Sequence, residues 1–196
     1  MIIDKEIQTY GEKNNVPISL EDTLSFLCQT INKNNCKQVL EIGTAIAYGT
    51  ITMAENSTAE HFDTVELEKE RYDIALQNIK KHNLQNKITA YNMDAEQYLK
   101  SCNKKYNLIY LDGPKGQYIN YLPYLIKLLE TGGIIVADNI YFHGMVTGKI
   151  PITKGCRAMI KGLKNYIKAI ITHPQLDSKI YEIGDGLGFS IKKGEQ

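Results

Sequence analysis

The chain lacks several features that would place it in a specialised class. None of its apolar runs is long enough to cross a bilayer, and residues 1–15 are polar and charged, unlike a signal peptide. The formal net charge over 196 residues is only +1, so any basic surface must be local. Low-complexity segments, repeats and long linkers are also missing. We therefore expect a soluble, cytoplasmic protein without a membrane partner, built as one domain spanning residues 1–196.

Cysteine is scarce, and its spacing excludes two further classes. The four cysteines form no CxxC pair, which argues against a zinc knuckle and against a disulfide framework; they are Cys28, Cys36, Cys102 and Cys156. We expect reduced thiols. Hydrophobic residues make up 43% of the chain and charged residues 23%, which are ordinary values for a globular domain with a sizeable core.

Short apolar runs alternate with helical segments from residue 38 onward. Such runs, bounded by turn signals, are typical of buried parallel strands, which we expect at residues 38–42, 61–67, 87–92, 107–111 and 133–137. Helices are expected between them, one ending near Met53 and others at 69–83, 95–102, 118–130 and 153–173. This alternation predicts a parallel sheet with helices on both faces.

The N-terminal part departs from the alternation. Residues 1–35 are expected to form a helical segment that packs on the domain, with a break at Pro17 and an N-cap at Ser19. The segment from Ser19 to Ile31 has the apolar spacing of an amphipathic helix.

Glycine and proline mark the ends of the later elements. Pro123 predicts a break or a late start in the helix at 118–130, and Thr131-Gly132-Gly133 predicts its C-terminal cap. Residues 179–193 predict two strands joined by Gly184-Asp185-Gly186, which form an antiparallel hairpin at one edge of the sheet.

Two expected strands end in acidic residues. Asp112 follows the strand at 107–111, and Asp138 and Asn139 follow the strand at 133–137. Ligands of open α/β sheets bind beyond the carboxyl ends of the strands. These three side chains would give an all-oxygen site for Mg²⁺ or another divalent cation, and Lys115 is a candidate base beside it.

The first strand ends in a turn suited to a nucleotide-like ligand. Gly43 permits the sharp turn, and Glu66, at the end of the second strand, can accept both hydroxyls of a ribose. The pattern fits NAD or S-adenosylmethionine. Ala45 and Tyr48 stand where a G-x-G-x-x-G motif has glycine, which favours S-adenosylmethionine. Asp94-Ala95 can either hold an adenine edge or cap the next helix.

These residues together resemble the cation-dependent O-methyltransferases, the family of catechol and caffeoyl-CoA O-methyltransferases. The resemblance covers the chain from about Asn15 to the C-terminus. It is carried by EIGTAIAYGT (residues 41–50), by LDGPKGQY (111–118) with GGIIVADN (132–139), and by IGDGLGFSIKK (183–193). The family's fold is a Rossmann-like class I methyltransferase domain, a seven-stranded, mostly parallel sheet with a C-terminal antiparallel hairpin and helices on both faces.

The resemblance implies a role for each matching residue. Asp112, Asp138 and Asn139 would bind the metal, and Lys115 would help to deprotonate an acceptor hydroxyl, with Asp112 also at the catalytic centre. The residues implied in cofactor binding are Glu41, Gly43, Thr44, Ala45, Tyr48, Gly49, Glu66, Asp94, Ala95 and Asp112. Ala47 and Gly49 depart from the family pattern, which has glycine and serine at these positions.

Within the family, the chain is most similar to a short bacterial branch that includes a tRNA 5-hydroxyuridine methyltransferase. The segment NNVPIS (14–19) and the ending IGDGL point to this branch. The resemblance implies tRNA as substrate, S-adenosylmethionine as methyl donor, and a homodimer. The product would be 5-methoxyuridine at the wobble position of the anticodon.

The residues themselves provide one independent indication of RNA. Cations follow the helix at 153–173 at spacings of three and four residues, which places them on one face: Lys154, Arg157, Lys161, Lys164 and Lys168. This stripe can contact phosphates or be an ordinary solvated face. Arg157 is the best candidate for a phosphate contact, with Lys154 and Lys161 beside it. His143 either lines the substrate opening or is a simple loop residue.

Three other functions remain open. The same chemistry can act on a small catechol-like molecule instead of tRNA. Ala47 and Gly49 make a non-catalytic nucleotide-binding protein conceivable, although such a protein would not need Asp112, Lys115, Asp138 and Asn139 together. An NAD oxidoreductase fits least well.

Overall fold

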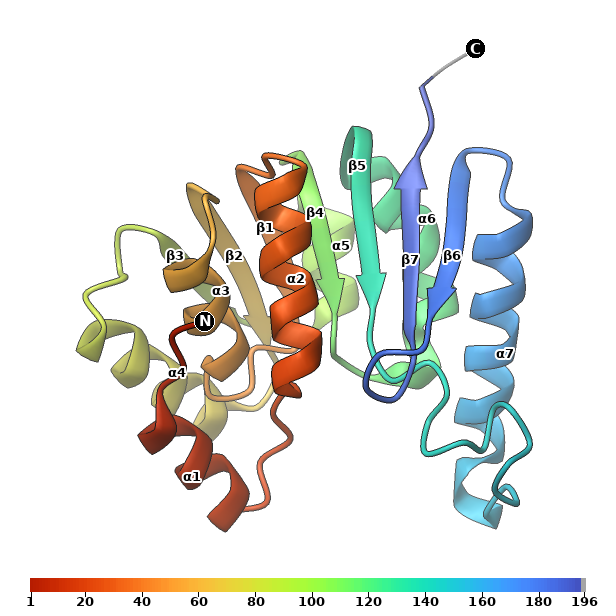
Figure 1. Cartoon of the computed structure of the whole chain (residues 1–196), viewed down its shortest axis with the longest axis horizontal. Coiled ribbons are helices and arrows are strands. Elements are labelled where there is room, and N and C mark those ends of the chain that lie inside the picture. Colours follow the sequence, from red (N-terminus) through yellow and green to blue (C-terminus); the bar gives the residue numbers. More distant parts are fainter. Residues whose placement is uncertain (195–196) are drawn as a thin grey trace.

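The computed structural model describes residues 1–194 and has one seven-stranded sheet flanked by helices (Figure 1). The strands are β1 (Gln38–Ile42), β2 (His61–Glu66), β3 (Ile88–Asn92), β4 (Tyr106–Leu111), β5 (Leu129–Ala137), β6 (Leu176–Tyr181) and β7 (Leu187–Lys192). Their order is β3-β2-β1-β4-β5-β7-β6. The first five pair in parallel, while β7 runs antiparallel to both β5 and β6. The expected fold class, with its terminal antiparallel hairpin, is confirmed.

The helices form two layers around the sheet (Figure 1). Their bounds are α1 (Lys5–Lys13), α2 (Glu21–Lys33), α3 (Tyr48–Asn56), α4 (Lys69–Lys81), α5 (Ala95–Ser101), α6 (Tyr118–Leu128) and α7 (Arg157–Thr172), with short 3₁₀ turns η1 (Lys115–Gln117) and η2 (Lys154–Cys156). One apolar cluster packs α2, α3 and α4 on the first face, and another packs α5, α6 and α7 on the second. No helix of residues 1–194 is both long and apolar enough to traverse a bilayer.

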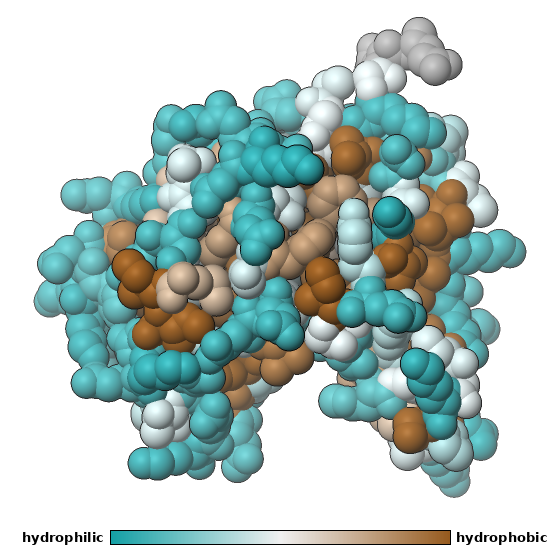
Figure 2. Space-filling view, viewed as in Figure 1, coloured by the Kyte–Doolittle hydropathy of each residue, from teal (hydrophilic) through white to brown (hydrophobic). Residues whose placement is uncertain are grey.

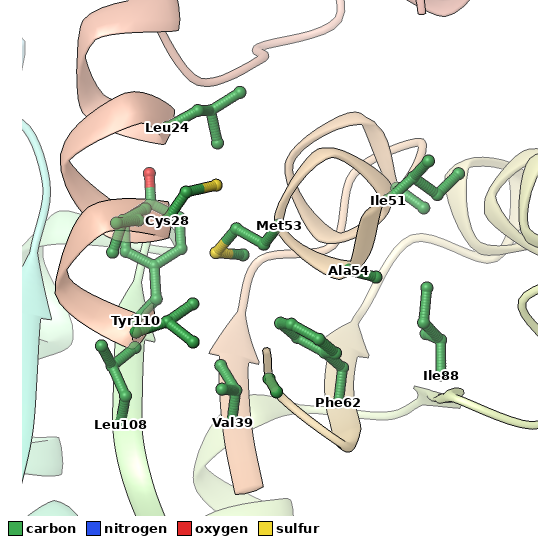
Figure 3. Packing of buried hydrophobic residues seen from close by; sticks show 14 of the residues in the cluster. Leu24, Cys28, Val39, Ile51, Met53, Ala54, Phe62, Ile88, Leu108 and Tyr110 are labelled. Carbon is green, nitrogen blue, oxygen red and sulfur yellow. The ribbon is translucent and has the colours of Figure 1, made fainter. Parts of the chain in front are cut away.

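Helix α2 shows how the apolar spacing determines packing. Leu24, Leu27, Cys28 and Ile31 recur at helical intervals and are all buried against the sheet. Figure 3 shows Leu24 and Cys28 above Tyr110, which extends from β4 toward the helix. All four cysteines are free thiols, as expected, and burial raises the pKa of Cys28 and of Cys36 to about 11.

Three local predictions were wrong. Ser19 does not cap α2: Leu20 occupies the N-cap position, and the Ser19 hydroxyl is used elsewhere. Pro123 neither breaks α6 nor delays its start, since the helix runs through it from Tyr118. Thr131-Gly132-Gly133 is not a helix cap, because β5 already begins at Leu129. There, a register shift against β4 accommodates Gly132, whose φ is +77°.

Candidate active site

The site lies at the carboxyl ends of the central strands β1 and β4. Gly43, with φ of +106°, begins the turn after β1, and a Cβ atom at this position would lie 2.4 Å from the carbonyl oxygen of Asp112. Only glycine permits the two turns to come this close. The amide of Asp112 also donates to the carbonyl of Ile42, so the two strand ends are joined backbone to backbone.

A cavity of about 310 Å³ opens beside this junction. Seven of the predicted residues line it: Gly43, Ala45, Glu66, Asp94, Ala95, Asp112 and Lys115. A much smaller pocket adjoins it, lined by Glu41, Thr44, Tyr48 and Gly49 among others. In Figure 2, the surface is hollowed between α1 and the start of α7. The structure thus brings the predicted cofactor residues together.

Glu66 is held in place by backbone donors. Its Oε2 accepts from the amide of Ala45 at 2.8 Å, and its Oε1 accepts from the amide of Glu68 at 2.8 Å. The side chain is 7% exposed, so the carboxylate is presented to the cavity in one orientation. Each carboxylate oxygen can accept a further bond, as binding a pair of ribose hydroxyls requires.

Glu41 lies deeper and is fully enclosed. The hydroxyls of Thr50 and Thr64 both donate to its Oε2, the latter at 2.6 Å. Burial outweighs these bonds and raises the pKa of Glu41 to about 8. A Cβ atom at Gly49 would lie 3.0 Å from Glu41 Oε1 and 3.3 Å from Ser19 Oγ. The space left by Gly49 is therefore bordered by a carboxyl and a hydroxyl.

Two predicted cofactor residues have structural roles of their own. Asp94 caps α5, its carboxylate accepting from the amide of Gln97 at 3.0 Å, although it also lines the cavity. The Tyr48 ring is 2% exposed and packs in the core, and its hydroxyl is buried without a hydrogen-bond partner.

Asp112 and Lys115 form a close pair at the edge of the cavity. Lys115 Nζ donates to Asp112 Oδ1 at 2.7 Å, and each side chain is 17% exposed. The other carboxylate oxygen accepts from the Ser19 hydroxyl at 3.0 Å. Both oxygens of Asp112 are thus fixed, and the ammonium group stays within reach of a ligand beside it.

Asp138 is connected to Asp112 through the buried Tyr110 and through Ser19, which donates to Asp112. The Tyr110 hydroxyl donates either to Asp138 Oδ2 at 2.9 Å or to Ser19 Oγ at 3.1 Å. Burial and then the charge of Asp112 raise the pKa of Asp138 to about 6. Because side chains alternate along a strand, Tyr110, Asp112 and Asp138 share the face that α2 covers. Asn139 follows with φ of +53°.

The loop after Asn139 is attached to the hairpin turn. The amides of Ile140 and Tyr141 donate to the carbonyls of Gly186 and Asp185. The carboxylate of Asp185 accepts from the amide of His143, at 3.0 and 2.7 Å to its two oxygens. The His143 side chain itself is 77% exposed. The turn residues therefore position the segment that carries the predicted metal ligands.

Other predicted residues lie outside the cavity. Within residues 1–194, no group of three or more His, Cys, Asp and Glu side chains is arranged to hold a metal ion. The predicted ligands Asp112, Asp138 and Asn139 include only two residues of these types, because the third is an amide. Arg157, Lys154 and Lys161 are exposed on α7 and η2 and line neither pocket.

Sequence reasoning missed Ser19, Tyr110 and Asp185. Tyr110 was detectable, because it lies two residues before Asp112 on a strand and so shares its face. Asp185 was visible only as part of the hairpin turn. Ser19 had no local signal, since its contact with Asp112 spans 93 residues.

Comparison with known proteins identifies the family. The family model for O-methyltransferase matches residues 4–193, so the chain belongs to this family, that of the cation-dependent O-methyltransferases. Tapetum-specific methyltransferase 1 of Arabidopsis thaliana is 28% identical over 187 residues, covering 92% of this chain and 80% of that protein. Caffeoyl-CoA O-methyltransferase of Citrus natsudaidai is 27% identical over 197 residues, covering 95% and 85%.

Solved structures agree. A candidate caffeoyl-CoA O-methyltransferase from Staphylococcus aureus superposes with a TM-score of 0.88 at 30% identity, covering 96% of this chain and 91% of that one. An O-methyltransferase from Bacillus cereus, solved in complex with SAH, gives a TM-score of 0.83 at 22% identity, covering 96% and 90%. At 22% identity, this second match shows a shared fold and nothing more.

Proposed function

We propose that this chain is a cation-dependent O-methyltransferase that transfers a methyl group from S-adenosylmethionine to the 5-hydroxyl of 5-hydroxyuridine in tRNA. The cavity supports the choice of donor. Glu66 presents its carboxylate where a ribose would bind, and Asp94 and Ala95 line the same cavity. Glu41 and Ser19 border the adjoining pocket, which suits the amino and carboxylate groups of a methionine.

The donor set at the strand ends fits a divalent cation. Asp112, Asp138 and Asn139 offer only oxygen ligands, the type that Mg²⁺ prefers. Burial and then the charge of Asp112 raise the pKa of Asp138 by disfavouring its ionised form, and a bound metal would favour that form. When bound, the metal would polarise the acceptor oxygen and lower the cost of its deprotonation.

The chain's own residues would contribute orientation and proton transfer. Lys115 Nζ, held 2.7 Å from Asp112, lies at the cavity edge. Once it has given up one proton, which a cation bound beside it would favour, its neutral amine is placed to receive the proton of an acceptor hydroxyl. Ser19 and Tyr110 fix the two carboxylates in position. Glu66 would hold the donor so that its methyl group faces the acceptor oxygen.

The observation that favours tRNA is the unpaired charge on η2 and α7. Lys154, Arg157, Lys161, Lys164 and Lys168 are exposed, and none takes part in an ion pair within the described residues. A row of free cations beginning near the cavity suits a substrate with a phosphate backbone.

The experiment that tests the acceptor offers the enzyme both substrate classes. Purified protein would be given labelled S-adenosylmethionine and Mg²⁺ with tRNA that contains 5-hydroxyuridine or with a catechol. We expect labelled tRNA and little labelled catechol, and charge reversal at Lys161 and Lys164 should weaken only the first reaction. Preferential labelling of the catechol, unaffected by the charge reversal, would favour a small-molecule substrate. The homodimer stays a prediction, which sedimentation would check.

A further inference from the structure

Helix α7 and the turn that carries Lys115 meet at two glycines. A Cβ atom on Gly162 would lie 2.8 Å from the carbonyl oxygen of Gly116 and 3.4 Å from its Cα atom. Cβ atoms do not come this close to backbone, so any other residue at 162 would force the two segments apart. Glycine inside a helix is less favourable than alanine, and here the close contact accounts for its presence.

The contact extends along α7 on both sides of Gly162. One turn earlier, the Cα of Met159 lies 3.5 Å from the position of a Cβ on Gly116. One turn later, the Tyr166 ring packs edge-on against Tyr118, with the centroids 5.6 Å apart. Tyr118 in turn donates to the carbonyl of Leu111 at 2.9 Å, next to Asp112. Three successive turns of α7 thus support the segment from Asp112 to Tyr118.

We propose that Gly162 is a positioning residue for Lys115. Within residues 1–194, no backbone hydrogen bond joins the 3₁₀ turn η1, which has Gly116 at its centre, to β4, whereas α7 packs directly against this turn. The contact of Gly162 with Gly116 determines the depth at which η1 rests and keeps Lys115 Nζ 2.7 Å from Asp112. The inference rests on the proposed function, in which Lys115 receives the acceptor proton.

The test compares Gly162→Ala with Gly155→Ala. Gly155 lies just before α7, and a Cβ atom there would meet nothing within 4 Å. In Gly162→Ala we expect kcat per folded molecule to fall about tenfold or more, because small displacements of a reacting group have effects of this size. The KM for S-adenosylmethionine should stay unchanged. Gly155→Ala should match the wild type. Amide hydrogen exchange of residues 113–117 should accelerate only in Gly162→Ala.

Two results would overturn the proposal. One is a folded Gly162→Ala protein with wild-type kcat, or with a changed KM alone. The other is unchanged hydrogen exchange at 113–117. If Gly162→Ala does not fold, Gly116→Val places a branched side chain between η1 and α7 at the same contact. This variant must then lower kcat in the same way, or the proposal fails. If the wild type methylates neither acceptor, the proposed function fails, and the exchange measurement still decides whether Gly162 positions the turn.

Discussion

The hydroxyl of Ser19 donates to Oδ2 of Asp112 at 3.0 Å, joining the segment before α2 to the end of β4. Tyr110 can donate to the same hydroxyl and so extends the connection toward Asp138. The N-terminal part of the chain therefore completes the site instead of merely covering the sheet. Each contact has consequences that can be measured.

Replacing Ser19 with alanine removes a donor to Asp112 and an acceptor for Tyr110. Because these groups are mostly buried, we expect unfolding to become easier by about 1–2 kcal/mol. We also expect affinity for S-adenosylmethionine to fall, since Ser19 borders the smaller pocket. Urea unfolding and calorimetric titration would measure the two effects. Ser25→Ala, within α2, is the control and should leave donor affinity unchanged.

Glu41 predicts a dependence of stability on pH. Burial raises the pKa of Glu41 in the folded protein to about 8. Between the pKa of this side chain in the unfolded chain and about pH 8, the folded protein therefore holds one more proton than the unfolded chain. Stability attributable to this group is therefore present at low pH and falls as the pH rises toward 8, at up to about 1.4 kcal/mol per pH unit. Glu41→Gln should remove this slope, as urea unfolding between pH 5 and 8 would reveal. Glu130→Gln, at an exposed position, should retain it.

Ala47 precedes α3 with φ of +66°, a left-handed conformation that costs a non-glycine residue about 1–2 kcal/mol. Ala47→Gly should therefore stabilise the protein, but by less than about 1 kcal/mol, because glycine raises the entropy of the unfolded chain and the buried methyl group of Ala47 is lost. Thermal unfolding would measure the gain. Ala158→Gly in α7, where the backbone is helical, should not raise stability, and an equal gain there would contradict the explanation.

The contact of Asp185 with the amide of His143 predicts that the hairpin turn affects the rate of methyl transfer. Asp185→Ala removes the acceptor for the amide of His143, which should loosen the loop that begins at Asn139. We expect faster hydrogen exchange at residues 139–146 and a lower rate of methyl transfer, by about tenfold. Asp177→Ala, an exposed acid on β6, is the control. Loss of activity without a change in exchange would assign Asp185 a different role.

The sequence predicted those parts of the site that depend on neighbouring residues. Asp112 and Asp138 were expected because each directly follows a short apolar run, and strand ends meet at one edge of a parallel sheet. The local pattern around Ser19 predicts a helix cap, whereas the partner that its hydroxyl contacts lies 93 residues away. The sequence around Gly132 predicts a helix stop, but a left-handed glycine suits a C-cap and a bulged strand equally well. Local patterns do not separate such alternatives.

The most direct test of the account is 5-methoxyuridine formation in tRNA that contains 5-hydroxyuridine. The tRNA would be incubated with the protein, S-adenosylmethionine and Mg²⁺, then digested and examined by mass spectrometry. We predict a product that disappears with EDTA, returns with added Mg²⁺, and is lost in Asp138→Ala and in Lys115→Ala. Product that persists in EDTA and in Asp138→Ala would contradict the proposed metal site.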